Sequence, residues 1–372
     1  MRTSRDIVVV GAGVIGCAVA YELARRGAAV QIVDERTAGM GATQASAGIL
    51  APFIESREGS PLFDLTVRSL NLFDEFVAGV TAVSGVPVLY RRTGTLDVAA
   101  DGVRMAELSR IAGALAARGV DAELLDGDGA RRAEPHLSSD IVGGLFVPAH
   151  GFVAASDLTR ALAEAARRYG ARLTEGCRVR RVGPDGDRLV VETDRGPLAC
   201  GAVVLAAGSW VRSIAIDGVP DPVPVRPVRG QLLHLGWSGA PLRRVTWASR
   251  CYLVPWDDGT LLVGATVEDA GFDERATVAG VRDLLEAVSE LIPQAWSASF
   301  RGARVGLRPA TPDNLPVVGR SAVVPALVYA TGHFRNGVLL APLTARLVAD
   351  LLLEGAIDSL PAALQPSRFG PL

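Results

Sequence analysis

Two glycine-rich segments, near opposite ends of the chain, have the composition of binding sites for a negatively charged ligand. The first is Gly11-Ala12-Gly13-Val14-Ile15-Gly16, and the second, residues 332–337, reads Gly-His-Phe-Arg-Asn-Gly. Glycine lets bare backbone N–H groups approach a phosphate, and the N-terminus of a following helix favours negative charge. One ligand reached from both ends of the sequence must be long, so the pattern favours FAD over NAD.

The spacing of the first segment matches a dinucleotide-binding turn. In such a turn Gly11 permits the tight bend, Gly13 lets the backbone approach a pyrophosphate, and Gly16 allows close packing of helix on strand. Asp34 follows Gly16 by eighteen residues. Its carboxylate suits the ribose hydroxyls of an adenosine and would repel a 2′-phosphate, which argues against NADP.

The elements around this turn can be predicted from hydrophobic periodicity. Residues 7–10 and 29–33 are short apolar runs, expected to be buried strands. Between them, residues 14–26 have the apolar spacing of a helix, and Gly27 suits its C-terminal end. A third buried strand is expected at 202–206 and another at 327–331, so strands from distant parts of the chain would form one parallel sheet. For 203–208 an ordinary core strand is the alternative.

Further helices and hairpins follow from capping residues and turn composition. Helices are expected from Ser60 to about residue 77, over 104–118, from a Ser156 cap to about Gly170, and over 338–353 up to Gly355. Hairpins are expected for strands 178–182 and 188–193, and for strands 251–254 and 261–264.

The order of these elements predicts an α/β chain, α+β overall, with a Rossmann-like FAD-binding domain built of discontinuous segments. Residues 1–85, 146–222 and 300–372 are assigned to that domain. An antiparallel-sheet substrate domain, residues 86–145 and 223–299, is inserted into it.

Composition excludes several functions. The chain has 372 residues and a formal net charge of −2, without a basic stripe, so no nucleic-acid partner is expected. It contains no lysine, which excludes a lysine Schiff base, a pyridoxal phosphate anchor and a Walker A lysine. The four cysteines are scattered, as expected of buried thiols in a reducing compartment, and no metal site or disulfide framework is predicted.

The first twenty residues also resemble a secretory signal, because two arginines precede an apolar run and Ala18-Val19-Ala20 mimics a cleavage site. The dinucleotide interpretation explains the same residues and Asp34 as well. No uncharged apolar stretch reaches the ~20 residues that a membrane span needs. A cytoplasmic protein without a membrane partner is expected.

Several further segments resemble one family. They are residues 41–50 (Gly-Ala-Thr-Gln-Ala-Ser-Ala-Gly-Ile-Leu), Arg229-Gly230-Gln231, Cys251-Tyr252-Leu253-Val254-Pro255, Gly306-Leu307-Arg308-Pro309, and residues 332–342. With the opening glycine segment they make the chain resemble the D-amino-acid-oxidase-type FAD family, and within it the bacterial glycine oxidases of thiamine biosynthesis. The resemblance runs nearly from end to end.

The resemblance implies a set of FAD contacts. Residues 41–50 would form a bed of small side chains against the flavin, the alternative being a flexible surface loop. Backbone N–H groups at residues 337–339 would stabilise negative charge on the reduced flavin. His333 is expected to be structural or flavin-adjacent and not a base. The predicted FAD contacts are Gly11, Ala12, Gly13, Val14, Ile15, Gly16, Asp34, Glu35, Arg36, Thr43, Gln44, Ser46, Ala47, Gly48, Ile49, Val179, Ala207, Gly208, Trp210, Gly332, His333, Phe334, Arg335, Asn336, Gly337, Val338 and Leu339.

Three residues are predicted to act on the substrate: Arg308, Tyr252 and Arg335. A guanidinium holds a carboxylate with two parallel hydrogen bonds, and Arg308 matches the carboxylate-binding arginine of the family. Tyr252 would add a phenolic donor and Arg335 positive potential. The alternative is that each arginine is a surface charge.

Arg250 departs from the family, in which a histidine often stands two residues before the tyrosine. Two interpretations stay open. Arg250 could bind a larger or more acidic substrate, because it shares a face with Tyr252 if the strand is regular. Equally, it could be a surface residue.

The resemblance implies oxidative deamination of glycine, sarcosine and small D-amino acids, with non-covalent FAD and dioxygen as acceptor, by a homotetramer. Covalent flavin is not expected, because residues 306–309 contain no cysteine. The alternatives are a dehydrogenase of the same family with another electron acceptor, a nicotinamide-dependent dehydrogenase, and a non-catalytic flavin-binding module.

Overall fold

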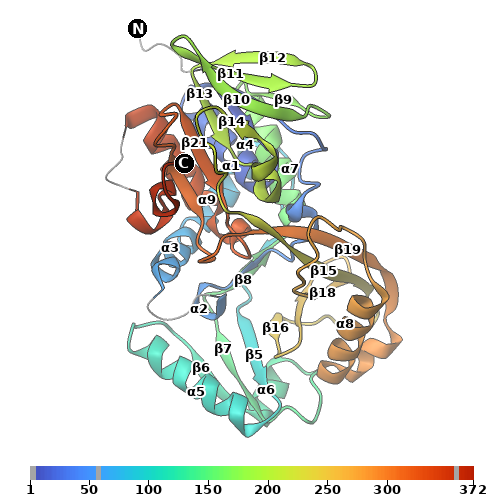
Figure 1. Cartoon of the computed structure of the whole chain (residues 1–372). Coiled ribbons are helices and arrows are strands. Elements are labelled where there is room, and N and C mark those ends of the chain that lie inside the picture. Colours follow the sequence, from blue (N-terminus) through green and yellow to red (C-terminus); the bar gives the residue numbers. More distant parts are fainter. Residues whose placement is uncertain (1–5, 56–59, 356–359) are drawn as a thin grey trace.

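The computed structural model describes residues 6–55, 60–355 and 360–372, and it is organised around two large sheets (Figure 1). The upper sheet has six strands in the order β20-β21-β13-β1-β2-β9, and the lower has eight in the order β19-β15-β18-β17-β16-β5-β7-β6. The mixed α/β prediction is confirmed.

The six-stranded sheet joins strands from distant segments, as predicted. β1 pairs in parallel with β2 and β13, β13 with β21, and β2 with β9, while β20 is antiparallel to β21. The strands are β1 (Asp6–Val10), β2 (Ala29–Val33), β9 (Arg172–Thr174), β13 (Ala202–Leu205), β20 (Val317–Arg320) and β21 (Leu327–Thr331).

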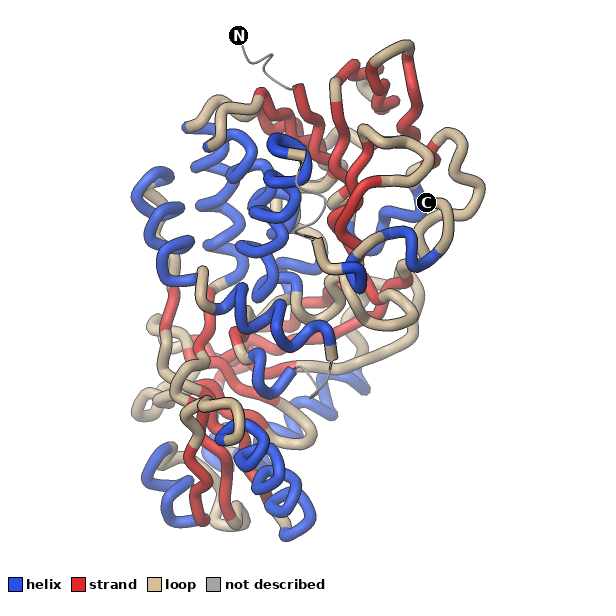
Figure 2. Tube along the Cα trace, turned by 90° about the vertical axis from the view of Figure 1, so that its left-hand side faces the viewer, coloured by secondary structure: helices blue, strands red, loops and turns tan. Residues whose placement is uncertain are grey.

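Both faces of this sheet are covered. Ile7 and Val9 of β1 join the core beneath the helices, whereas Val8 and Val10 point to the opposite core, because successive strand residues face opposite sides. Figure 2 shows the helical layer on one side and strands on the other. The helices are α1 (Val14–Arg25), α3 (Pro61–Leu70), α4 (Phe73–Ser84), α7 (Ala155–Arg168) and α9 (Gly337–Ala349), and the small sheet opposite them is made of β10 (Val179–Asp185), β11 (Arg188–Thr193), β12 (Gly196–Cys200) and β14 (Ala215–Ile216).

Helices α6 and α8 pack on one face of the eight-stranded sheet. Helix α5 packs on the opposite face at its β5–β7 end, and the rest of that face is turned toward the upper lobe. Leu233 and Leu253 pack with Leu284 of α8, whereas Leu232 and Val254 belong to the cluster on the inner face. Its elements are β5 (Thr95–Ala99), α5 (Gly102–Ala116), β6 (Glu123–Asp126), α6 (Gly127–Ala133), β7 (Gly143–Val147), β15 (Arg226–Gly236), β16 (Val245–Trp247), β17 (Tyr252–Pro255), β18 (Thr260–Gly264), α8 (Val278–Leu291) and β19 (Ser299–Ala310).

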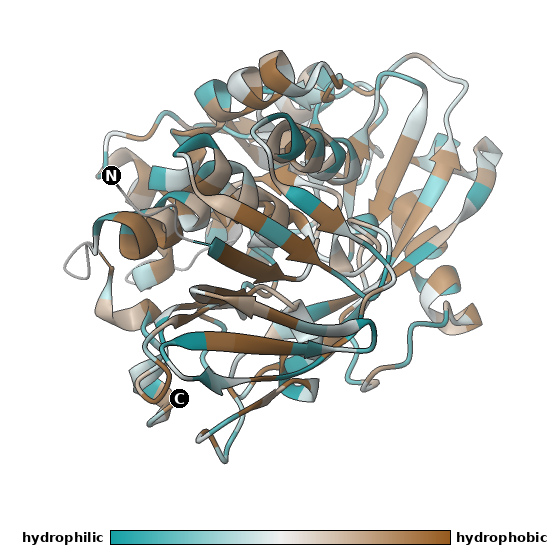
Figure 3. Cartoon of the chain, turned by 90° about the horizontal axis from the view of Figure 1, so that it is seen from above, coloured by the Kyte–Doolittle hydropathy of each residue, from teal (hydrophilic) through white to brown (hydrophobic). Residues whose placement is uncertain are grey.

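Short elements connect the two lobes. A three-stranded sheet lies between them, and apolar residues (brown in Figure 3) concentrate on the central strands. The remaining elements are β3 (Ile49–Leu50), α2 (Pro52–Glu55), β4 (Tyr90–Arg91), β8 (Gly151–Val153), and the short helices η1 (Ala42–Ala45), η2 (Gly208–Ser213), η3 (Pro293–Ser297), η4 (Asp350–Glu354), η5 (Ala362–Leu364) and η6 (Pro366–Phe369).

Two helix predictions need correction. The helix expected from Ser60 to residue 77 is two helices, α3 and α4, separated at Asn71 and Leu72; the Ser60 cap is confirmed, since its side chain accepts a hydrogen bond from Leu62 N. Apolar spacing is the same in both helices, so it cannot reveal a change of axis. Helix α7 begins at Ala155 with Ala154 as its N-cap, and Ser156 lies inside its first turn.

The remaining helices and both hairpins are close to their predicted positions. Helix α9 continues through a π-helical segment, η4, and ends at Gly355, which has φ +72°. Ala18-Val19-Ala20 are wholly buried within α1, as the dinucleotide interpretation requires. None of the helices within the described ranges combines the length and the apolar character that crossing a bilayer demands.

Candidate cofactor and substrate site

A cavity of about 400 Å³ lies between the two large sheets. Its wall contains residues of both glycine-rich segments, of residues 41–49, of the β13 end and of strands β17 and β19. The segments that the sequence singled out as chemically important therefore meet at one place.

The first glycine segment has the close contacts that its pattern predicts. Gly11 has φ +107°, and a Cβ there would overlap the Ala206 carbonyl. A Cβ on Gly16 would overlap the carbonyl oxygen of Gly11. Helix α1 therefore approaches the strand ends as closely as glycine permits, which leaves the backbone of the turn bare toward the cavity.

Asp34, at the end of β2, holds this turn. Its Oδ2 accepts a hydrogen bond from Ala12 N at 2.6 Å, and its Oδ1 accepts from Arg36 N at 2.7 Å. Burial raises the pKa of the carboxyl group, and the two backbone hydrogen bonds oppose that shift. A carboxylate has about four lone-pair positions, so Asp34 keeps acceptor capacity for ribose hydroxyls at the cavity wall.

Contacts between the two lobes lie beside the cavity wall at Arg36 and Trp210. The Arg36 guanidinium lies 4.3 Å from the centre of the Trp210 ring and forms a bidentate ion pair with Glu274, at 2.9 and 2.7 Å. Trp210 is also in ring contact with Phe272. Glu274 and Phe272 belong to residues 265–277, here called the β18–α8 loop, which therefore reaches from the eight-stranded sheet to the six-stranded one.

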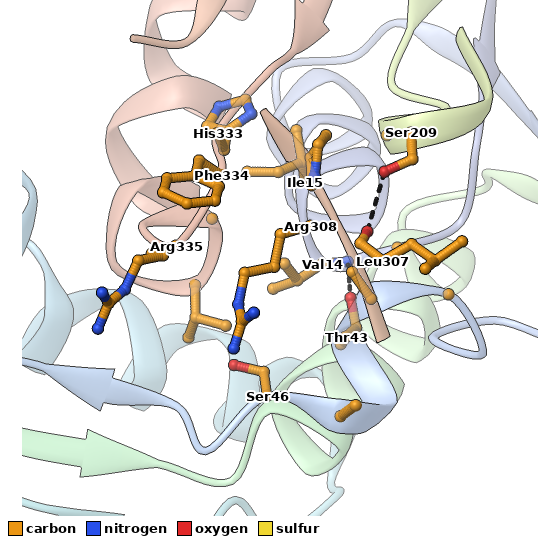
Figure 4. Close-up of a pocket in the computed structure, with 18 of the residues that line it drawn as sticks. Val14, Ile15, Thr43, Ser46, Ser209, Leu307, Arg308, His333, Phe334 and Arg335 are labelled. Atoms are coloured by element: carbon orange, nitrogen blue, oxygen red, sulfur yellow. Dashed lines mark hydrogen bonds between the residues drawn. The ribbon is translucent and has the colours of Figure 1, made fainter. Parts of the chain in front are cut away.

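Residues 41–49, except Gln44, line the cavity as a packed segment, which argues against a surface loop. Thr43 Oγ1 accepts from Val14 N at 3.1 Å, which ties the segment to the start of α1 (Figure 4). Gln44 Nε2 donates to the Val305 carbonyl at 3.0 Å. A Cβ on Gly306 would come within 2.9 Å of Ala45, so the small residues on both sides permit this packing.

The Arg308 side chain points into the cavity from β19, toward Ser46 (Figure 4). Its Nη1 donates to the Thr266 carbonyl at 3.0 Å and to the Arg229 carbonyl at 3.4 Å. The guanidinium crosses Gly230, where a Cβ would overlap it. Glycine at position 230, within the Arg-Gly-Gln segment, is therefore a condition for this orientation of Arg308.

Tyr252, the first residue of β17, lies at the same wall. Its ring crosses Gly264 of β18 and contacts Trp247 of β16, with 5.0 Å between ring centres. Strands β17 and β19 are separated by two others in the sheet. Both predicted carboxylate-binding residues thus extend from one face of the eight-stranded sheet into the cavity.

The second glycine segment contacts the Arg308 region directly. Phe334 has φ +47°, a backbone conformation that is costly outside glycine, and its N–H donates to the Pro309 carbonyl at 2.9 Å. His333 is buried, with Nε2 3.0 Å from the Thr344 hydroxyl, and burial lowers its pKa to about 3. Its imidazole is neutral at physiological pH. Arg335 is exposed at the rim (Figure 4).

Arg250 also lies at the rim, in the turn before β17. The condition for a shared face with Tyr252 is not met, because the strand begins only at Tyr252. The Arg250 side chain is 48% exposed. Its guanidinium bonds to the Glu290 carboxylate at 2.6 Å, which raises the pKa of Arg250. This pairing favours the interpretation of Arg250 as a surface residue.

Most of the predicted cofactor residues line the cavity, and a few lie behind its wall. The residues outside the lining are Ala12, Gly16, Gln44, Gly332, Asn336 and Leu339, of which Ala12, Gly16 and Gln44 support it through the contacts above. The prediction missed wall residues outside the segments that it singled out, among them Ser209, Trp247, Ala265 and Val267. Contacts between distant segments place them there. In the described part of the chain, no cluster of three or more His, Cys, Asp or Glu could hold a metal ion.

A family model described as FAD dependent oxidoreductase matches residues 6–351 of the chain. The chain belongs to this family. It is 34% identical to a glycine oxidase from Geobacillus kaustophilus over 96% of both chains, and the crystal structure of glycine oxidase from that organism superposes with a TM-score of 0.91, covering 99% of this chain and 98% of the other. It is also 36% identical to the bifunctional protein ThiO/ThiG of Nostoc sp., over 98% of this chain but 55% of that protein's length.

The cofactor of this family member is FAD, and the residues at the cavity fit it. The bare turn at Gly11–Gly16 and the N-terminus of α1 suit the pyrophosphate, Asp34 suits the adenosine ribose, and α9 begins at the cavity with Gly337 and Val338. The expectation of FAD, drawn from two distant glycine segments, is confirmed, and the nicotinamide alternative is set aside.

Proposed function

We propose that this FAD-dependent protein oxidises the amine of small amino acids, principally glycine, to a 2-oxo acid and ammonia, and that dioxygen accepts the electrons to give hydrogen peroxide. The observation that carries the proposal is the position of the Arg308 guanidinium. It lies in the cavity, bonded to the Thr266 carbonyl, with Tyr252 on the same wall. The likeness to the Geobacillus kaustophilus glycine oxidase supports the substrate.

In this proposal the chain's residues bind and orient, and FAD supplies the hydride acceptor. Arg308 holds the substrate carboxylate with two parallel hydrogen bonds, and Tyr252 donates a third from its phenolic O–H. Fixing the carboxylate directs the α-carbon C–H toward the cofactor site, a positioning effect that removes much of the entropic barrier. Arg335, at the rim, adds positive potential that attracts the carboxylate.

No side chain is needed as a general base. His333 is buried and bonded to Thr344, and because burial lowers its pKa to about 3, its imidazole would be a weak base at neutral pH. The substrate amine enters neutral, and water hydrolyses the imine product. The first turn of α9 directs the positive end of its dipole at the cavity, where it favours electron transfer into the site.

We propose that sarcosine and small D-amino acids are also substrates, and that FAD is held without a covalent bond. Burial raises the pKa of Cys251, at the cavity wall, to about 12, so this thiol stays protonated. The other proposal is a dehydrogenase of the same kind with a non-oxygen acceptor. Peroxide formed per amine oxidised separates the two.

We propose further that the six-stranded lobe (residues 1–85, 146–222 and 300–372) holds FAD and that the inserted segments (86–145 and 223–299) hold the substrate. β19, in the third segment, is a strand of the eight-stranded sheet and brings Arg308 to the substrate. The likeness to the ThiO/ThiG protein supports a role in thiamine biosynthesis. The proposal that the protein is a cytoplasmic homotetramer comes from the sequence and its family resemblance alone.

Replacing Arg308 tests the proposed function. Arg308→Ala removes the carboxylate's principal partner, and losing one side of such a pair costs about 2–5 kcal/mol. We expect kcat/KM for glycine to fall by roughly 30-fold or more, with FAD still bound. Arg301→Ala, on the same strand but bonded to Thr260 and outside the cavity lining, is the matched control. Unchanged kinetics in Arg308→Ala would remove this residue from the site.

A further inference from the structure

The Thr266 carbonyl that holds Arg308 belongs to the β18–α8 loop, which has no regular secondary structure over residues 265–277 apart from one bridge. A loop carbonyl can orient a guanidinium only if the loop itself is held in place. What holds Thr266 therefore decides how well Arg308 is oriented.

Glu268 is the centre of the contacts that hold this part of the loop. Its Oε1 accepts from the Thr266 hydroxyl at 2.5 Å and from Gln231 Nε2 at 2.8 Å. Its Oε2 accepts from Arg229 Nη2 at 2.6 Å and from Arg229 Nε at 3.1 Å. Both backbone groups of Glu268 also bond to those of Arg229, at 2.9 Å each.

The partners of Glu268 are themselves fixed in the sheet. Gln231 and Arg229 lie two residues apart on β15, and both are buried. Gln231 N donates to Thr266 Oγ1 at 2.9 Å, and Gln231 Oε1 accepts from Thr277 N, so the loop is attached at two points. Buried charges need a partner, and the Arg229 guanidinium has Glu268 on one side and Asp273 at 3.0 Å on the other.

We propose that Glu268 is a positioning residue for substrate recognition: it fixes Thr266 against β15 so that the Thr266 carbonyl orients the Arg308 guanidinium for a carboxylate. This rests on the proposed function of Arg308. Glu268 itself does not line the cavity and would not touch the substrate. Hydrogen bonds from Thr266, Gln231 and Arg229 lower its pKa, so it is ionised at neutral pH.

The test uses the FAD-loaded Glu268→Gln protein, which keeps the side-chain shape but removes the charge between Thr266 and Arg229. Two quantities are measured: the KM for glycine, and the dissociation constant of acetate, a carboxylate without an amine, from the perturbation of the flavin spectrum. We expect both to rise together by roughly tenfold, with kcat within about twofold and FAD content unchanged. A merely structural role would lower FAD content or kcat instead.

Asp269→Asn is the matched control, because it makes the same kind of substitution at the next residue. The Asp269 side chain is 85% exposed, and its nearest ion-pair partner, Arg226, is 3.9 Å away. Asp269→Asn should leave both constants at wild-type values. If Glu268→Gln does not fold, the same two constants are measured for Thr266→Val. This substitution removes the hydroxyl that bonds to Glu268 and leaves Arg229 paired with Glu268. A smaller rise in the same two constants is then expected.

Acetate binding and glycine KM at wild-type values in the folded variants would overturn the role of Glu268. An equal effect of Asp269→Asn would do so too. These outcomes are distinct from failure of the proposed function. In that case glycine would not reduce the flavin of the wild-type protein.

Discussion

Gly230→Ala changes the position of Arg308 without altering Arg308 itself. Gly230 lies on β15 and needs no left-handed backbone, so alanine fits the main chain there. The added methyl group would overlap the Arg308 guanidinium, well inside the 3.0 Å that real Cβ contacts respect. The flexible guanidinium has to move, and the 3.0 Å hydrogen bond from Nη1 to the Thr266 carbonyl cannot keep its geometry.

The size of the effect follows from what is displaced. A hydrogen bond to a charged group contributes about 1.5–3 kcal/mol, which is roughly 10- to 150-fold in an equilibrium constant. Misplacing a binding group by about 1 Å costs a comparable factor of roughly 100. We therefore expect kcat/KM for glycine and the affinity for acetate to fall by roughly 10- to 150-fold, while FAD remains bound.

The assay is a double-mutant cycle with Arg308→Ala, read as kcat/KM for glycine. If Gly230→Ala acts through Arg308, it should cost little more once that side chain is gone. Gly113→Ala, in α5 with open space around the position, is the control and should leave the kinetics unchanged. Wild-type acetate affinity in Gly230→Ala, or a full cost that persists in the Arg308→Ala background, would refute this reasoning.

Two further predictions concern the cofactor end and the buried histidine. Glu274→Gln breaks the partly exposed pair with Arg36 that joins the lobes. A surface pair contributes about 0–1 kcal/mol, so FAD should dissociate at most roughly fivefold faster. Flavin fluorescence after dilution measures this, and a rate raised well beyond fivefold contradicts it. His333 has a pKa of about 3 when folded and 6.5 as its ordinary value, so its contribution to stability is complete above pH 6.5 and is lost as the pH falls toward 3. At pH 5 the loss is about 2 kcal/mol, and a folded His333→Gln protein should show a smaller drop in melting temperature between pH 7 and pH 5 than wild type; equal drops would count against the buried neutral imidazole.

The parts of the fold that the sequence predicts are those encoded locally. The β1–α1–β2 unit is predicted by the spacing of its apolar residues, a glycine turn and Asp34, all within about thirty residues. The two hairpins are predicted by the composition of their turns. The division of residues 61–84 into two helices does not follow, because apolar spacing carries no information on the direction of the helix axis.

The parts of the site that could not be predicted depend on contacts between distant residues. The β18–α8 loop carries no periodic pattern, and its position comes from pairs such as Arg229 with Glu268 and Arg36 with Glu274, which are 39 and 238 residues apart. Arg250 shows the same limit, since its partner Glu290 is 40 residues away on α8. Residue type identified Arg308 and Tyr252 as candidates, but only the sheet order brings them to one wall.

The most direct test of substrate oxidation is an anaerobic visible spectrum of the purified protein, titrated with glycine and then exposed to air. We predict that the flavin band near ~450 nm bleaches as glycine is added, and that air restores it with formation of hydrogen peroxide. A flavin band that glycine leaves unchanged would contradict the proposed glycine oxidation.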